Sequence, residues 1–159
     1  MERIPMTRKG YEKLLDELNH LKRVERPKNV RAIEEARSNG DISENADYDA
    51  AKEQQARIVF RIGELEGKLA AAEIVDISKL GGQTTVVFGA TVTLFDSARE
   101  TEISYRIVGP DEASTKDGTI SVTSPLGQAL IGKEEGDSVE VRTPSGTREY
   151  GIVRIEYIE

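Results

Sequence analysis

The chain contains no cysteine and no tryptophan, and its 159 residues include a single histidine, His20. Without cysteine it forms no disulfide, offers no thiolate nucleophile and holds no cysteine-ligated zinc. One imidazole cannot build a histidine-rich metal site, and His20 lies in a charged helical stretch where we expect an exposed side chain. These absences exclude cysteine chemistry and histidine-rich metal binding.

Long apolar runs are also missing. No stretch approaches the roughly 18 consecutive apolar residues of a membrane span, and the N-terminus lacks the basic-then-apolar layout of a signal peptide. A composition of 37% hydrophobic and 32% charged residues is typical of a soluble globular protein. We therefore expect no membrane partner and a cytoplasmic location.

Positively charged residues are outnumbered as well: 22 Lys and Arg against 29 Asp and Glu give a formal net charge of −7. Free duplex DNA binding is not expected, since such affinity comes mainly from lysine and arginine displacing counterions from phosphates. The deficit is uneven. Residues 1–75 hold 14 Lys and Arg against 15 Asp and Glu, whereas residues 76–159 hold 8 against 14. The N-terminal half can therefore still offer a local basic patch to a polyanion.

The sequence does contain a heptad repeat, which runs through "YDAAKEQQARIVFRIGELEGKLAAAEIV". The positions at alternating steps of three and four are Tyr48, Ala51, Gln55, Ile58, Ile62, Leu65, Leu69 and Ala72. A seam sustained for over three repeats predicts one strand of a coiled coil.

The same rhythm marks an earlier helix. Its positions are Tyr11, Leu14, Leu18 and Leu21, followed by Val30 and Ile33 after Pro27. Pro27 should kink this helix or restart it, because proline donates no helical hydrogen bond. Gly40 suits the left-handed position that ends the helix. A short turn then makes the two helices antiparallel, and about 30 residues per arm at ~1.5 Å each gives a rod of roughly 45 Å.

After residue 84 the chain is rich in Val, Ile, Thr and aromatic residues and reads as strands separated by turns. The predicted strands lie in "TTVVFGATVTLF", "TEISYRIV", "GTISVTS", "DSVEVRT" and "REYGIVRIEYI", with a hairpin loop at Pro144 and Gly146. One short helix is predicted from Ser124 as N-cap and Pro125 at the first position, ending at Gly132.

The predicted fold class is α+β. An N-terminal antiparallel coiled-coil hairpin occupies residues 1–76, with an acidic tip near 39–49. A linker covers 77–83, and a small α+β domain with an antiparallel sheet covers 84–159.

The tip "SNGDISENADYDAAKEQQ" concentrates carboxylates between the two helices. Asp41 and Glu44 are three residues apart at the start of the second helix, which is the spacing of a capping box. The alternative is that both face outward and bind a metal. Two carboxylates make only half of a magnesium site, so a partner must supply phosphate and further ligands. A long rod that carries this half-site down a channel fits two-metal phosphoryl chemistry.

Basic and aromatic residues flank the tip. Arg37 precedes the turn and Lys52 follows it, so both can contact a phosphate backbone, or both can be solvated charges that offset the acids. Tyr48 favours seam packing over base stacking. Asp47 and Asp49 add acids on the helix face, where solvation is the simpler interpretation.

The order of "GDISENADYDAAKEQQ", "VFGATVTL", "YRIVGPDEA", "ISVTSPLGQALIGKEEGD" and "YGIVRIEYIE" resembles the Gre-type transcript cleavage factors of bacteria, and within them the GreA-like branch. The resemblance runs over essentially the whole chain. It implies a coiled coil that enters the secondary channel of RNA polymerase and a C-terminal domain, similar to immunophilin-type prolyl isomerases, that docks at the channel rim.

The resemblance also implies a function and its residues. Asp41 and Glu44 would share a Mg²⁺ with polymerase and stimulate its endonucleolytic cleavage of backtracked nascent RNA, so the chain is a factor and not an enzyme by itself. Arg37 and Lys52 fall on the RNA-contacting positions, where lysine in place of arginine keeps the charge but loses the planar fork. The polymerase-facing loop falls on Ser124 and Pro125.

Two other functions remain open. A prolyl isomerase needs a concave aromatic pocket, whereas most aromatic residues after residue 84 fall at strand positions expected to pack inward. A passive adaptor would bridge proteins through the coiled coil with no chemistry at the tip.

Overall fold

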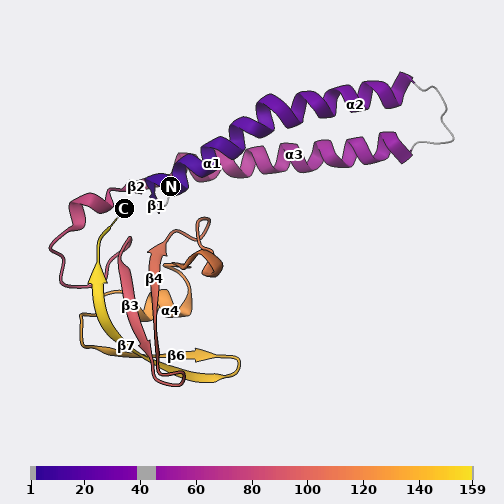
Figure 1. Ribbon diagram of the computed structural model, residues 1–159. Helices are drawn as coiled ribbons and strands as arrows, with labels where there is room; N and C mark the ends of the chain where they lie inside the picture. Colours follow the sequence, from indigo (N-terminus) through magenta and orange to yellow (C-terminus); the bar gives the residue numbers. More distant parts are fainter. Residues whose placement is uncertain (1–2, 39–45, 159) are drawn as a thin grey trace. The chain divides into compact units, whose positions relative to one another are not determined.

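A computed structural model describes residues 3–38 and 46–158 (Figure 1). The chain divides into two compact units. Unit 1 is Tyr11–Ala72, and unit 2 combines Arg3–Gly10 with Glu73–Glu159. The first helix therefore begins in unit 2 and continues into unit 1.

Unit 1 is a helical hairpin. Its first arm consists of α1 (Arg8–His20), a π-helical turn η1 (Leu21–Glu25) and α2 (Arg26–Ser38), and its second arm is α3 (Ala46–Ala71). Figure 1 shows α2 and α3 side by side. Asn29 contacts Ala51 while the earlier Glu17 contacts Arg61, so the two arms run antiparallel as predicted.

The predicted seam of α3 is confirmed. Ala51, Ile58, Ile62 and Leu65 are buried, and the remaining heptad positions of this helix are partly buried. On the facing arm Leu14 and Leu18 are buried. At about 25 cal/mol per Å² of apolar surface, this seam is what holds two otherwise charged helices together.

The seam position predicted at Val30 is wrong. Val30 is 44% exposed, and its neighbour Asn29 is buried at 3%. The position of Asn29 on the seam follows from η1, in which the Arg26 N–H donates to the Leu21 carbonyl five residues back. Pro27 lacks an N–H and its ring crowds the carbonyl four residues earlier, so a widened turn relieves the conflict. Steps of three and four from Leu21 would reach residues 28 and 32 in an unbroken α-helix, and the extra residue moves these seam positions to Asn29 and Ile33. Ile33 is partly buried, as predicted.

Unit 2 contains two sheets. A two-stranded sheet pairs β1 (Ile4–Thr7) with β2 (Ala72–Val75). The larger sheet has the order β5-β4-β3-β7-β6. Its strands are β3 (Thr91–Asp96), β4 (Thr101–Val108), β5 (Thr119–Ser121), β6 (Ser138–Thr143) and β7 (Gly146–Glu156).

The predicted antiparallel sheet needs one correction, because β4 and β5 pair in parallel. Their connection, residues 109–118, includes a 3-10 turn η3 (Thr115–Asp117) and returns the chain to the same end of the sheet, as a parallel pair requires. The other three pairings are antiparallel. The N-terminal and post-helical strands β1 and β2 were not predicted.

The strand predicted from residue 84 begins only at Thr91. Gly89 has φ of 92°, a conformation that ends extended structure, and a Cβ there would lie 2.9 Å from the Ile77 side chain. Ile77 opens a 3-10 turn η2 (Ile77–Leu80) within the predicted linker. Val86 and Ala90 are nevertheless fully buried in the core.

The core of unit 2 lies between the sheet and α4 (Pro125–Leu130). Its fully buried members include Val92, Leu94, Ile107 and Leu130. The predicted β6–β7 hairpin loop is confirmed at residues 144–145, with Gly146 at φ of 128°. Among the described helices, none combines the length and apolarity needed to cross a membrane.

Candidate functional site

The hairpin must hold its two arms in fixed register if it is to position a tip. Near the tip end, the Asn29 side chain donates from Nδ2 to the Ala51 carbonyl at 2.9 Å. Asn29 is 3% exposed, so this polar group is satisfied inside an apolar seam. A single buried polar pair of this kind opposes sliding, because any shift of one arm leaves the amide unpaired.

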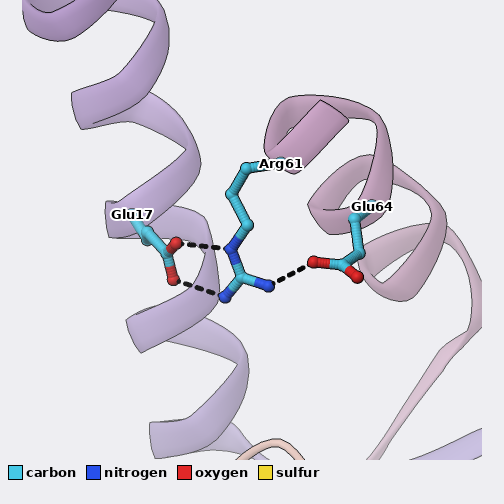
Figure 2. Close-up of polar contacts among 3 residues, drawn as sticks. All are labelled: Glu17, Arg61 and Glu64. Atoms are coloured by element: carbon cyan, nitrogen blue, oxygen red, sulfur yellow. Dashed lines mark hydrogen bonds and ion pairs between the residues drawn. The ribbon is translucent and has the colours of Figure 1, made fainter. Parts of the chain in front are cut away.

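A second cross-arm contact lies further from the tip (Figure 2). The Arg61 guanidinium donates to both carboxylate oxygens of Glu17, at 2.6 and 2.9 Å, and to Glu64 on its own helix at 2.6 Å. Hydrogen bonding to Arg61 lowers the pKa of Glu17, and the two carboxylates raise the pKa of Arg61. The bidentate geometry fixes both distance and orientation between α1 and α3.

The tip segment lies between the ends of these two arms. Asp41 and Glu44, the predicted metal-sharing pair, lie outside the described residues, as does Gly40. Arg37 is exposed in the last turn of α2. Lys52 is exposed in the second turn of α3, where its Nζ donates to Gln55 at 2.8 Å. The structure thus places both predicted RNA contacts on solvent-facing helix surface beside the tip segment.

The flanking acids and aromatic residue have ordinary surroundings. Asp47 and Asp49 are exposed in the first turn of α3, where negative charge favours the helix N-terminus. Tyr48 is partly buried, which fits the seam interpretation. His20 is exposed, as predicted, with its side chain at 58%. No cluster of three or more potential metal-binding side chains occurs in the described part of the chain.

The second candidate surface is the start of α4. The Ser124 hydroxyl accepts from the Gly127 N–H at 3.1 Å and donates to the Ser121 carbonyl at 2.6 Å, so the predicted N-cap is confirmed. Pro125 follows as the first helical residue and is exposed. A Cβ on Gly127 would lie 2.3 Å from the Ser121 carbonyl oxygen, so glycine allows this turn to pack closely on β5.

An open groove of about 500 Å³ runs beside the same helix. It is lined by Gln128, Ala129, Ile131, Lys133, Ser138, Val139 and Glu140. No aromatic side chain is among them. This lining does not resemble the apolar, aromatic pocket that binding a peptidyl-proline needs.

Both halves of the chain match known protein-family models. Residues 4–74 match the N-terminal model described as "Transcription elongation factor, N-terminal". Residues 81–157 match "Transcription elongation factor, GreA/GreB, C-term". The chain belongs to the GreA/GreB family of transcription elongation factors.

Curated relatives extend this match over the full length. "Transcription elongation factor GreA" of Hyphomonas neptunium is 58% identical over 99% of both chains. The protein of the same name from Methylococcus capsulatus is 54% identical over 99% of this chain and all of its own. Among solved structures, GreA factor homolog 1 of Thermus thermophilus is 32% identical, covers 98% of this chain and 99% of its own, and superposes with a TM-score of 0.44. The identities of 58% and 54% to the curated relatives confirm the GreA-like resemblance predicted from the sequence.

Sequence reasoning missed four structural residues of this GreA/GreB family member. Asn29 in the seam is polar and gave no periodic signal. The Glu17–Arg61 pair had a weak signal in the sequence, because each residue lies next to a predicted seam residue. Glu112, described below, lies in the segment after β4 and has no local pattern that marks it.

Proposed function

We propose that this protein binds RNA polymerase, inserts its helical hairpin into the secondary channel and stimulates the polymerase's own endonucleolytic cleavage of backtracked nascent RNA. The observation that carries the proposal is the 58% identity, over 99% of the chain, to a transcription elongation factor GreA. Such rescue operates where transcription takes place, in the bacterial cytoplasm, and the protein is a stimulating factor and not an enzyme by itself.

Asp41 and Glu44 are the residues proposed to share a Mg²⁺ with the polymerase active site. Their donor set fits this ion, because Mg²⁺ prefers oxygen ligands and is held by one or two carboxylates together with phosphates and water. When bound, the ion supplies charge neutralisation for attack by water on the RNA phosphodiester. The chain's own contribution is to deliver two carboxylates and to leave the remaining coordination positions to polymerase and RNA.

Arg37 and Lys52 are proposed to contact the extruded RNA 3′ segment. Their exposure on the last turn of α2 and the second turn of α3 supports this role, since each can reach a phosphate without desolvating a buried group. Arg37 can grip a phosphate with two parallel N–H donors, whereas Lys52 acts as a point charge.

Residues 84–159 are proposed as the polymerase-docking domain, with a fold similar to immunophilin-type prolyl isomerases. The exposed Pro125 and the capped turn at Ser124 provide a rigid feature for the contact. The aromatic-free groove beside α4 argues against isomerase activity, and a peptide isomerisation assay on the full-length protein should show no rate above background.

The test is cleavage in halted, backtracked elongation complexes over a series of Mg²⁺ concentrations, with and without the protein. We expect faster release of short RNA 3′ fragments and a lower Mg²⁺ requirement. Asp41→Asn and Glu44→Gln should each reduce stimulation by at least about 100-fold, because each removes a charged ligand from the reacting centre.

Asp47→Asn and Asp49→Asn are the matched controls, since they remove charge from the first turn of α3, close in sequence to the proposed pair, and leave the pair itself unchanged. Full stimulation by both tip variants would contradict the metal role. It would favour the passive adaptor, in which occupancy of polymerase alone produces the effect.

A further inference from the structure

A carboxylate in the segment between β4 and η3 is fastened to the start of the first helix. Glu112 Oε2 accepts from the Thr7 N–H at 3.0 Å and from the Gly109 N–H at 3.0 Å. Its Oε1 accepts a hydrogen bond from the Thr7 hydroxyl. The Thr7 hydroxyl oxygen in turn accepts from the Gly10 N–H at 3.0 Å, which is an N-cap for α1. Residues 105 apart in sequence are thus joined through one side chain.

Two glycines make room for this carboxylate. A Cβ on Gly10 would lie 2.1 Å from the Glu112 carboxyl carbon and 2.2 Å from its Oε1. A Cβ on Gly109 would lie 2.8 Å from the Pro5 carbonyl oxygen and 3.0 Å from Glu112 Oε2. Glycine inside a helix is unfavourable relative to alanine. Its presence at position 10 is explained by the space that Glu112 occupies.

We call the hydrogen-bonded group of Glu112, Thr7, Gly10 and Gly109 the clamp. It lies at the root of the hairpin, the point where the chain enters the first arm. Thr7 is the last residue of β1 and immediately precedes α1, which continues past Gly10 into unit 1. β1 pairs with β2, the strand that follows α3. The chain therefore enters and leaves the hairpin through one small sheet. Within unit 2, Glu112 joins the end of β1 and the first turn of α1 to the segment that follows β4.

We propose that Glu112 is a positioning residue, which fixes the end of β1 and the first turn of α1 within the unit that carries Ser124 and Pro125, at the point where the chain continues into the first arm of the hairpin. The inference rests on the proposed function, in which one unit docks and the other delivers the tip. Thirty residues of helix span about 45 Å, so a tilt of about 5° at the root moves the far end by roughly 4 Å. A misplacement of about 1 Å can cost on the order of 100-fold in rate.

The test compares full-length Glu112→Gln and Glu112→Ala with Asp117→Asn, a matched control that removes an exposed acid from the same connection between β4 and β5. In halted elongation complexes, the maximal cleavage rate at saturating protein should fall at least about tenfold for both Glu112 variants. The concentration giving half-maximal effect should change less than about threefold, because the docking surface is intact.

A merely structural role would lower stability throughout unit 2, so amide hydrogen exchange separates the two explanations. We expect the amides of Thr7 and Gly10 to exchange faster in the Glu112 variants, with the amides of Leu94 and Ile107 in the core strands unchanged. Faster exchange in those core strands, or an unchanged maximal cleavage rate, would overturn the positioning role.

The clamp itself has a reciprocal test that needs no polymerase. Gly10→Ala should lower the Tm of the wild-type protein, because its Cβ displaces the Glu112 carboxylate. In the Glu112→Ala background the space is free, and Gly10→Ala should leave the Tm equal or higher. An equal change in Tm from Gly10→Ala in both backgrounds would contradict the contact between Gly10 and the Glu112 carboxylate. If the wild-type protein fails to stimulate cleavage while this sign change is observed, the proposed function has failed and the clamp has not.

Discussion

At the scale of single residues, the cross-arm ion pair of Glu17 and Arg61 controls how acid affects the hairpin. Hydrogen bonding to Arg61 lowers the pKa of Glu17 below its ordinary value of 4.5. A carboxylate with a lowered folded-state pKa stabilises the fold above its unfolded pKa, and this stabilisation is lost as pH falls through the folded value.

Glu17→Gln should therefore lower the free energy of unfolding at pH 7 by about 0.5 kcal/mol, a small value because both partners are more than a third exposed. The difference from wild type should shrink below pH 4.5 and also in high salt. Chemical denaturation at several pH values measures it, with Asp16→Asn as the control on the same exposed turn of α1. A difference that persists unchanged at pH 3 would contradict the assignment.

Substitutions at Asn29 and Val30 test which of these residues lies on the seam after the π-turn. Asn29→Ala should cost ~1 kcal/mol or more, because it removes a buried hydrogen bond and leaves a small void in the seam. Val30→Ala should cost less than about 0.5 kcal/mol, since Val30 is largely solvated. Urea unfolding of the two variants gives the comparison. The reverse order would place the seam at Val30, the position predicted from the sequence.

At the scale of elements, α3 carries two interior glycines with no evident role in the free protein. An added Cβ at Gly63 or Gly67 meets nothing within 4 Å, and neither has a positive φ. Both are exposed, so neither serves a close approach within the hairpin.

Gly63→Ala and Gly67→Ala should each raise the unfolding free energy by about 0.5–1 kcal/mol, because alanine loses less conformational entropy on entering a helix. Thermal unfolding measures the gain, and stimulated cleavage should be unchanged. A loss of stimulation in a stabilised variant would show instead that this face of α3 is contacted in the complex.

At the scale of the whole molecule, the proposed function assigns docking on polymerase to one part of the chain and stimulation of cleavage to the tip. Pro125→Arg should raise the protein concentration needed for half-maximal cleavage by about tenfold or more, because a bulky charge then replaces an exposed docking residue. The maximal rate should stay near wild type, whereas tip variants should lower that maximum. Titrations of cleavage separate the two parameters. Ser145→Arg, in the β6–β7 loop, is the control, and equal effects from both arginine variants would remove Ser124–Pro125 from the docking surface.

Features that depend on near neighbours in the chain could be predicted from the amino-acid sequence. The heptad steps from Tyr48 to Ala72 predicted the buried face of α3, and Ser124, Pro125 and Gly132 predicted α4, because periodicity and capping are local. Both interpretations of Arg37 and Lys52, as RNA contacts or as solvated charges, require exposed side chains, and both side chains are exposed. Asp41 and Glu44 lie outside the described residues, so their role stays a prediction.

Features that depend on residues far apart in the chain became visible only in the folded protein. The π-turn before Pro27 adds one residue to the first arm, so Asn29 and Ile33 lie on the seam in place of residues 28 and 32, and Val30 is exposed. The parallel pairing of β5 depends on where a ten-residue connection returns. The Glu112 carboxylate meets Thr7 across 105 residues, and no local pattern encodes a hydrogen bond whose two partners come together only when the chain has folded.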